Sequence, residues 1–304
     1  MRLLSPQSRR TLSANKWRYL SLVAGFFLFV APLALFTRLV YALTGNTATA
    51  TLHSICYRMP FDWLLGGRYL MLWGSVAAVF VLAVVVVSYF AGPVFCGWLC
   101  PVGAISEGLS RIAPLPDKLR LKPGSSTSSG LRWGFLAGFA SVSLCVGSRL
   151  FGGSLGSICC RFCSSSVLQN CAYASTGDTE AVDYWSSGSM LALGAWLGLG
   201  GLFLRGGRGW CLFFCPLGAI SNLAHRLGAR RGWLATRFKE TSCRSCPTCS
   251  VGCPAGALRP DRSVDLSLCM NCYECTHSCA QGAYECTTMK QTGEPTPALE
   301  LVSR

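Results

Sequence analysis

Eight of the chain's 19 cysteines stand in two runs of the same spacing near the C-terminal end. CRSCPTCSVGCP begins at position 243 and CMNCYECTHSC begins at position 269. Each run has the pattern Cys-x2-Cys-x2-Cys-x3-Cys, which is typical of chains that hold two [4Fe–4S] clusters, the fourth cysteine of each run binding the other cluster. The spacing predicts cluster 1 on Cys243, Cys246, Cys249 and Cys279, and cluster 2 on Cys269, Cys272, Cys275 and Cys253.

Zinc and disulfides are the two alternatives for these cysteines, and both are less favoured. Paired Cys-x2-Cys motifs suit tetrahedral zinc, but zinc requires no third cysteine at the same interval. Pro254 directly follows Cys253, and a proline after the fourth cysteine of the run is typical of bacterial ferredoxins. A disulfide framework is typical of oxidising compartments, whereas the charge pattern described below predicts that both runs lie in the cytoplasm.

A second set of cysteines lies in a segment that occurs twice. FCGWLCPVGAIS begins at position 95 and WCLFFCPLGAIS at position 210, so the two copies share Cys-x3-Cys-Pro-x-Gly-Ala-Ile-Ser. Proline favours the first turn of a helix, and a helix is therefore expected after each Cys-Pro. The duplicated motif, as we call it, contains Cys96 and Cys100 in its first copy and Cys211 and Cys215 in its second.

These four thiols are candidates for an additional redox or metal site. Cysteine packs well as a small apolar side chain, but the repeated proline and glycine favour a chemical role. Three such roles remain open at this level: a further cluster that bridges the two copies, a dithiol–disulfide couple, and a metal ion that is held in passage.

The composition is that of a membrane protein, with 51% hydrophobic and only 13% charged residues. A membrane-crossing helix needs about 20 apolar residues, and four stretches meet this requirement, at 17–43, 69–92, 131–151 and 184–204. Lysine and arginine gather before the first, after the second and after the fourth stretch. The positive-inside rule then predicts that both termini are cytoplasmic. The net charge of +14 is explained by this topology and by anionic lipid, not by nucleic acid.

The predicted fold is an α-helical membrane protein whose four transmembrane helices form a duplicated hairpin, followed by a C-terminal ferredoxin-like α+β domain with two clusters. The expected outer loops support the duplication, because Ser-Ile-Cys-x-Arg occurs in both, at 54–58 and 157–161. The expected parts are a basic cytoplasmic N-terminus at 1–16, the membrane domain at 17–232, the ferredoxin-like domain at 233–290 and a disordered tail at 291–304.

The duplicated motif together with the double-cluster tail resembles the ferredoxin-type membrane proteins of the NapH and MauN group and, more distantly, the membrane part of NosR. The resemblance implies a multi-pass electron carrier of the bacterial cytoplasmic membrane, often the membrane subunit of a quinol dehydrogenase that serves a periplasmic redox enzyme. Nitrate reduction and methylamine utilisation are the pathways that it suggests. One departure is Ala280, which follows Cys279 where bacterial ferredoxins have proline.

The expected function is a relay of electrons between the quinone pool and a ferredoxin-like or cytochrome partner, with the duplicated motif near the entry or exit point. No catalytic side chain is predicted, because the redox chemistry belongs to the clusters. The alternative is an assembly or maturation factor for a metalloenzyme, in which the four cysteines of the duplicated motif handle a metal such as copper. A transporter is disfavoured, because the four stretches lack a central ionised residue.

Overall fold

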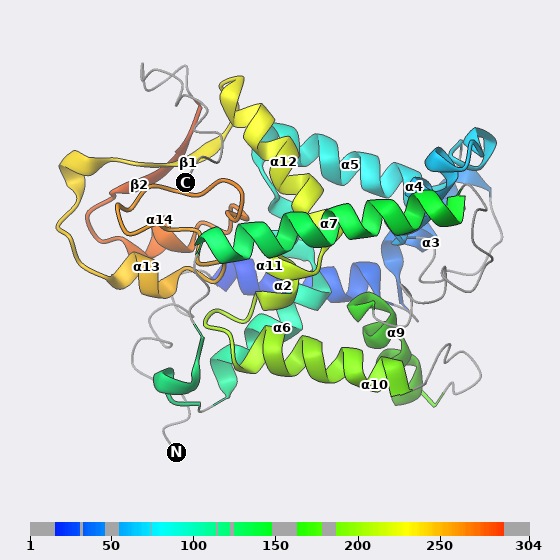
Figure 1. Cartoon of the computed structure of the whole chain (residues 1–304), viewed down its shortest axis with the longest axis horizontal. Coiled ribbons are helices and arrows are strands. Elements are labelled where there is room, and N and C mark those ends of the chain that lie inside the picture. Colours follow the sequence, from blue (N-terminus) through cyan, green and yellow to red (C-terminus); the bar gives the residue numbers. More distant parts are fainter. Residues whose placement is uncertain are drawn as a thin grey trace.

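The computed structural model of the 304-residue chain describes residues 16–30, 33–45, 55–73, 75–113, 115–121, 125–147, 163–177 and 187–288. Nearly all of the predicted basic N-terminus, the predicted tail at 291–304 and the second outer-loop copy at 157–161 lie outside these residues. The described residues form helices and one small sheet. Four of the helices, α2, α5, α7 and α10, extend along the long axis of the molecule, and the C-terminal residues cover one end of them (Figure 1).

The helical part divides at the same point as the sequence repeat. Its first half contains α2 (Lys16–Phe29), α3 (Leu35–Thr44), α4 (Arg58–Leu65), the short turn η2 (Tyr69–Met71), α5 (Val76–Ala91), the π-helical turn η3 (Phe95–Leu99) and α6 (Pro101–Ile112). Its second half contains η4 (Asp117–Leu119), α7 (Ser125–Gly147), α9 (Ser164–Ser175), α10 (Ser187–Gly194), the π-helical turn η5 (Ala195–Leu202), α11 (Gly209–Phe213) and α12 (Pro216–Arg230).

The prediction of four transmembrane helices is wrong. Within the described residues, no helix has both the length and the hydropathy that crossing a membrane requires. The stretch at 17–43 is two helices, α2 and α3, with a left-handed residue at Ala34 (φ 36°) just before α3. α5 has 16 residues and rises about 24 Å at 1.5 Å per residue, less than the hydrocarbon core of about 30 Å.

The other two predicted spans fail for related reasons. Residues 131–147 of the third stretch belong to α7, which has 23 residues but begins with a serine-rich turn that lowers its hydropathy. The stretch at 184–204 contains the eight-residue α10, after which the hydrogen bonding changes to the π-helical pattern of η5. Apolar composition therefore overestimated the length of continuous helix, because it contains no signal for these interruptions.

Each half packs its motif helix, α6 or α12, partly against its own half and partly against the other half, and we call this arrangement the exchanged packing. α6 packs on α2 of its own half and on η5 of the other, while α12 packs on α7 of its own half and on α5 of the other. Likewise η3 contacts α2, and the corresponding α11 contacts α7. The contacts of one half are thus repeated by the equivalent elements of the other, and the duplication extends from the sequence to the packing.

A cluster of phenylalanines stabilises one of these contacts. The rings of Phe29 in α2, Phe80 in α5 and Phe95 in η3 meet at centroid distances between 5.2 and 5.6 Å. Leu217 of α12 belongs to the same buried core. Aromatic pairs at such distances contribute about 0.5–1.5 kcal/mol each beyond the area that they bury, so the start of the duplicated motif is held firmly against α2 and α5.

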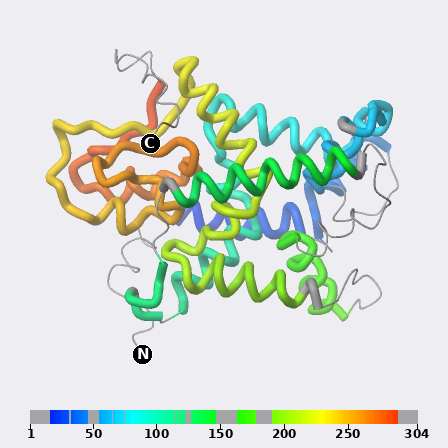
Figure 2. Tube along the Cα trace, in the orientation of Figure 1, coloured from blue at the N-terminus to red at the C-terminus, as the bar shows by residue number. Residues whose placement is uncertain are grey.

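The C-terminal residues form a small domain of loops around two short helices and a two-stranded sheet (Figure 2). Its elements are β1 (Ala235–Phe238), η6 (Glu240–Ser242), α13 (Thr248–Gly252), α14 (Glu274–Ser278) and β2 (Tyr284–Thr287). β1 and β2 are antiparallel, with Ala235 opposite Thr287 and Phe238 opposite Tyr284. The sheet brings the residues before the first cysteine run next to those after the second, so the two runs lie between its strands in sequence and close together in space.

Candidate functional site

The small C-terminal domain that begins with β1 and ends with β2 is called the tail from here on. Its two cysteine runs adopt the same loop conformation at their first turn. Ser245 lies between the first two cysteines of the first run and Asn271 at the same place in the second, and both have a left-handed backbone, with φ of 62° and 46°. Left-handed non-glycine residues cost about 1–3 kcal/mol and occur mostly at functional sites. The loops therefore bear a conformational cost that keeps successive cysteines of each run on the same side.

The four cysteines assigned to cluster 2 come together. Each of the six pairs among Cys253, Cys269, Cys272 and Cys275 is close enough that charge on one sulfur raises the pKa of the other. The same four side chains line one cavity. Burial, with this mutual repulsion, raises the pKa of Cys272 to about 11. A metal group that binds here must therefore displace protons from the thiols.

The cysteines assigned to cluster 1 gather around a separate core cluster of the tail. Cys249 is buried with Tyr284, and Cys243 and Cys279 pack against this pair. Cys246 is exposed. The structure therefore gathers three of the four predicted cysteines in one core cluster and places the fourth at the surface beside them in sequence.

Hydrogen bonds reach several of these sulfur atoms. The Arg262 Nη1 donates to Cys243 Sγ at 3.4 Å, and the backbone N–H groups of Ser245 and Ala283 donate to Cys243 and Cys279, also at 3.4 Å. In the other group the N–H of Ala257 donates to Cys253 Sγ. Donors of this kind stabilise negative charge on sulfur and so favour a bound, more reduced cluster.

The duplicated motif forms the helices that its prolines predict. α6 begins at Pro101 with Cys100 as its N-cap, and α12 begins at Pro216 with Cys215 as its N-cap. The Gly218 N–H donates to Cys215 Sγ at 3.4 Å. Both predictions of a helix after Cys-Pro are confirmed, and each helix presents a thiol at its N-terminal end, where the dipole and the free N–H groups favour a thiolate.

The structure brings the four cysteines of the duplicated motif together as well. Burial and the neighbouring Cys211 raise the pKa of Cys215 to about 12, and the same causes raise the pKa of Cys100 to about 11. All six pairs among Cys96, Cys100, Cys211 and Cys215 interact electrostatically. Within the described ranges, no three His, Cys, Asp or Glu side chains are placed to hold a metal ion, either at the duplicated motif or in the tail.

The glycine of the duplicated motif makes room for a buried arginine in both copies. A Cβ on Gly103 would lie 1.7 Å from Nη1 of Arg208, and a Cβ on the equivalent Gly218 would lie 2.8 Å from Nη2 of Arg132. Both distances are shorter than real Cβ contacts. Each copy therefore needs glycine at this position because a guanidinium group occupies the space beside the helix.

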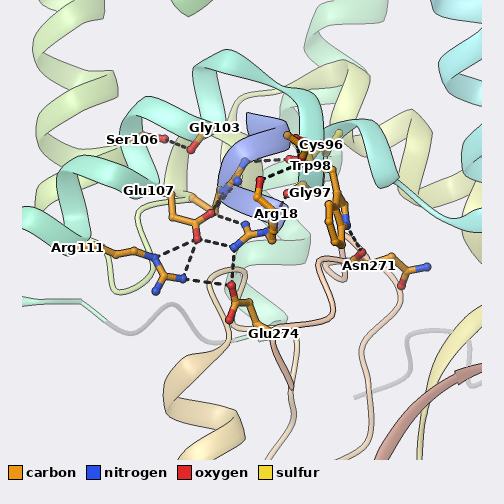
Figure 3. A network of polar contacts seen from close by, with 12 residues as sticks. Arg18, Cys96, Gly97, Trp98, Gly103, Ser106, Glu107, Arg111, Asn271 and Glu274 are labelled. Atoms are coloured by element: carbon orange, nitrogen blue, oxygen red, sulfur yellow. Dashed lines mark hydrogen bonds and ion pairs between the residues drawn. The ribbon is translucent and has the colours of Figure 1, made fainter. Parts of the chain in front are cut away.

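A buried network of charged side chains joins α2, α6 and the tail (Figure 3). Glu107 of α6 accepts hydrogen bonds from Arg18 at 2.6 and 2.9 Å, from Arg111 at 2.8 Å and from Arg208 at 2.8 Å. Arg18 also donates to Glu274 at 2.7 Å. Burial alone would raise the pKa of Glu107, but the three guanidinium groups lower it well below its usual range. The carboxylate is thus held ionised in the interior.

Sequence reasoning missed this network. It treated Arg18, Arg111 and Arg208 only as basic residues beside the predicted membrane helices, used to predict which side is cytoplasmic. It assigned no role to Glu107. The sequence did contain one indication of the network. Glu107 lies four residues before Arg111 on the predicted motif helix, which is the spacing of an ion pair on one helix face. The apolar stripe of α6 turns outward at Ile112, which is exposed, while the buried face carries Ser106, Glu107 and Ser110.

The duplicated motif and the tail are in direct contact. A Cβ on Gly97 would lie 2.5 Å from the Met270 carbonyl oxygen and 3.4 Å from the Cα of Cys272. Trp98 Nε1 donates to the Asn271 carbonyl at 3.0 Å. Both contacting segments lie next to cysteines, so the loop of cluster 2 is seated on the first copy of the duplicated motif.

Comparisons with known proteins match parts of this chain to an iron–sulfur domain and to ferredoxin-type proteins. A family model described as a 4Fe-4S binding domain matches residues 73–123 and 189–234, which contain the two copies of the duplicated motif rather than the tail. No solved structure gives a significant match.

Three relatives are informative. YccM of Escherichia coli is 23% identical over 71% of this chain and 59% of its own length. The ferredoxin-type protein NapH of Haemophilus influenzae is 26% identical over 68% of this chain and 67% of its own. The methylamine utilization ferredoxin-type protein MauN of Methylobacillus flagellatus is 29% identical over 54% of this chain and 49% of its own. The chain thus spans about half to two thirds of the length of these relatives.

Two parts of the chain match a 4Fe-4S binding domain, and the chain is similar to the ferredoxin-type proteins NapH and MauN and to YccM, which is named as a putative electron transport protein. The predicted resemblance to NapH and MauN is confirmed.

Proposed function

We propose that the protein is a membrane-associated electron carrier that relays single electrons between the quinone pool and a redox partner protein. Its tail holds two [4Fe–4S] clusters, cluster 1 on Cys243, Cys246, Cys249 and Cys279 and cluster 2 on Cys253, Cys269, Cys272 and Cys275. The observation that carries this proposal is the mutual proximity of all four cluster 2 sulfurs around one cavity.

The residues of the tail fit such clusters. Four thiols for each group are what a [4Fe–4S] cluster requires, and the bound clusters supply one-electron redox chemistry. The left-handed Ser245 and Asn271 hold the cysteine loops open, and backbone N–H groups donate to ligand sulfurs. These residues orient the thiols before any metal binds, so less conformational entropy is lost on binding.

The two clusters have different surroundings, so each would exchange electrons with a different partner. Cys246 of cluster 1 is exposed, whereas Cys269 and Cys272 of cluster 2 are buried next to the helical part. A soluble ferredoxin-like or cytochrome partner would therefore exchange electrons at cluster 1. Cluster 2 would exchange them with the helical part.

Quinol is the proposed reductant or product at the helical end. Oxidation of a quinol releases two electrons and two protons, and the clusters accept the electrons one at a time. The family of the chain supports this role, since NapH and MauN are named as ferredoxin-type proteins and MauN is assigned to methylamine utilization. We propose a respiratory or periplasmic redox system of the nitrate reductase or methylamine type as the partner pathway.

The cytoplasmic membrane of a bacterium is the proposed location, with the tail on its cytoplasmic side. The described helices expose large apolar side chains in number, among them Leu20 of α2, Leu82 of α5 and Leu191 of α10, which are 59–67% exposed. Exposed apolar side chains in such number are typical of proteins that contact lipid or another apolar partner. The exposed Arg231, at the end of α12, and Arg244, in the tail, would face anionic head groups or solvent.

Anaerobic purification of the full chain in detergent, with iron and acid-labile sulfide counts, tests the cluster assignment. Replacing one predicted ligand of each group, as in Cys249→Ser and Cys272→Ser, should each remove about four irons. Cys286→Ser is the matched control, because Cys286 lies in β2 and belongs to neither set, and it should retain the full count. Retention of all iron in Cys272→Ser, or zinc without sulfide, would refute the assignment.

Adding a reduced quinone to the purified protein tests the relay. We expect menadiol or decylubiquinol to produce the electron paramagnetic resonance signals that dithionite produces. If dithionite reduces the clusters and neither quinol does, the quinone part of the proposal fails and the electron carrier remains. For the location, the protein should sediment with membranes in low-salt buffer, and recovery in the soluble fraction would contradict it.

A further inference from the structure

We propose that Asn222 and Arg132, both in the second half of the helical part, are the positioning residues of cluster 2. They hold the backbone from Leu266 to Cys269, so that the thiols of this loop lie in place before the cluster binds. The proposal rests on the proposed electron-carrier function, to which cluster 2 belongs. It assigns to the second copy of the duplicated motif the role of a support for this cluster.

Three carbonyl groups of the cluster 2 loop accept hydrogen bonds from these two side chains. The Asn222 Nδ2 donates to the Leu266 carbonyl at 2.8 Å and to the Cys269 carbonyl at 2.7 Å. The Arg132 Nη1 donates to the Ser267 carbonyl at 2.6 Å. Both side chains are buried, at 2% and 3% exposed, so water does not compete for these carbonyls. The helical part therefore fixes the backbone up to the first cysteine of the second run.

The two side chains also hold each other. The Arg132 Nη2 donates to the Asn222 Oδ1 at 2.9 Å, and this bond joins α7 to α12. An amide side chain has one oxygen acceptor and two N–H donors. In Asn222 the oxygen binds the guanidinium and the nitrogen binds the loop. The pair therefore acts as one unit between the helices and the tail.

The first half contains the equivalent pair with a different chemistry. Arg18 of α2 donates to Glu107, 89 positions later, and Arg132 of α7 donates to Asn222, 90 positions later. Both acceptors directly follow the Gly-Ala-Ile-Ser of the motif. The carboxylate of Glu107 can only accept hydrogen bonds. A carboxylate at position 222 would place oxygen against two carbonyl oxygens, so the loop requires the amide there.

The helical part supports the second cysteine run in particular. Among the described residues, the side-chain hydrogen bonds that join the helical part to the cysteine loops all reach the second run or the residues just before it. The first copy holds the later part of this run through Trp98, which binds the Asn271 carbonyl, and through Arg18, which binds Glu274. The second copy holds its beginning. Cluster 2 is therefore the one whose geometry depends on the helices.

Thiol reactivity of the metal-free full chain in detergent tests the proposal without a cluster. Asn222→Asp keeps the oxygen acceptor and removes both donors to the loop. We expect iodoacetamide to label Cys269 and Cys272 about tenfold faster than in the wild type, because the loop opens more often. Mass spectrometry of the peptides measures each cysteine, and Cys243 of the first run should keep its wild-type rate. Wild-type rates at Cys269 and Cys272 would overturn the proposal.

Asn170→Asp is the matched control. It makes the same change at a buried asparagine of α9, which lies at the end of the helical part away from the tail (Figure 1). Labelling of Cys269 and Cys272 should stay at the wild-type rate. An equal increase in this control would show general loosening and would overturn the proposal. Asn222→Ser removes the same donors without adding a charge, and it gives the same expected labelling if Asn222→Asp does not fold.

The midpoint potential of cluster 2 is the second measurement, and its signal is the one that Cys272→Ser lacks. In Asn222→Asp this potential should fall, because the added negative charge disfavours the reduced cluster, while the other signal keeps its potential. A wild-type potential for cluster 2 would overturn the role of Asn222 as a positioning residue. Absence of iron and sulfide from the wild type would refute the proposed function instead, and labelling of the metal-free chain would still decide whether Asn222 holds the loop.

Discussion

Glu107→Gln removes the charge that holds the buried network together. Three arginines, Arg18, Arg111 and Arg208, donate to this one carboxylate, and all but Arg111 are almost fully buried. The neutral amide keeps the shape of the side chain but offers one acceptor atom and places two N–H donors against guanidinium groups. Only Glu274 then remains to compensate three positive charges.

The expected loss follows from the burial of the pair. Removing one partner of a buried ion pair costs about 3–5 kcal/mol, because the other charge is left uncompensated. This corresponds to a decrease of about 140- to 3,700-fold in the ratio of folded to unfolded protein, at 1.4 kcal/mol for each factor of ten. Glu285→Gln is the matched control. Its partner Lys239 is 48% exposed, and exposed pairs contribute about 0–1 kcal/mol.

Denaturant titration of the purified full chain in detergent, followed by far-ultraviolet circular dichroism, measures both variants. We expect the Glu107→Gln midpoint to fall well below that of Glu285→Gln, with an unchanged slope. Equal losses below 1 kcal/mol in both variants would refute the reasoning, because they would mean that water reaches the three arginines and that the network is not buried in solution.

Three further substitutions test other parts of the structure. Gly97→Ala should cost about 1–3 kcal/mol through overpacking against the cluster 2 loop, whereas Gly108→Ala, with open space, should stabilise α6 by about 0.5–1 kcal/mol, and denaturant titration measures both. Burial lowers the pKa of His225 to about 4 from 6.5. The unfolded chain therefore binds the extra proton, and stability should fall by about 3 kcal/mol as the pH falls through this window. Denaturation series should show no such slope in His225→Gln and the full slope in His277→Gln, where the residue is exposed; equal slopes would contradict the assignment. Arg262→Gln removes a donor to a cluster 1 sulfur and should lower the midpoint potential of that cluster in a redox titration, and an unchanged potential would exclude that donor.

The local chemistry of this chain is largely predictable from its sequence. Cysteine spacing predicts the loop conformation, because two intervening residues leave room for only a tight turn. The structure has a left-handed residue at the same position of both runs, Ser245 in the first and Asn271 in the second. The Cys-Pro pairs likewise predict where α6 and α12 begin, since proline has a fixed φ that suits a first helical turn.

The long-range arrangement was not predictable in the same way. Mean hydropathy treats 17–43 as one apolar stretch and cannot register the left-handed Ala34 that separates α2 from α3. Arg18 has the composition of a membrane flank but contacts Glu107, 89 positions away. Pairing over such a separation depends on the packing of α2 against α6, for which a single sequence contains no periodic or spacing signal.

The exchanged packing of α6 and α12 makes each half the cover of the other. One half alone would expose the face of its motif helix that the other half covers, and it would hold only two of the four motif thiols. The two copies nevertheless differ where the tail docks. The residue after the first cysteine is Gly97 in one copy and Leu212 in the other, and a side chain at position 97 would collide with the loop of Met270 and Cys272. A nearly symmetric support therefore carries its cysteine loops on one side only.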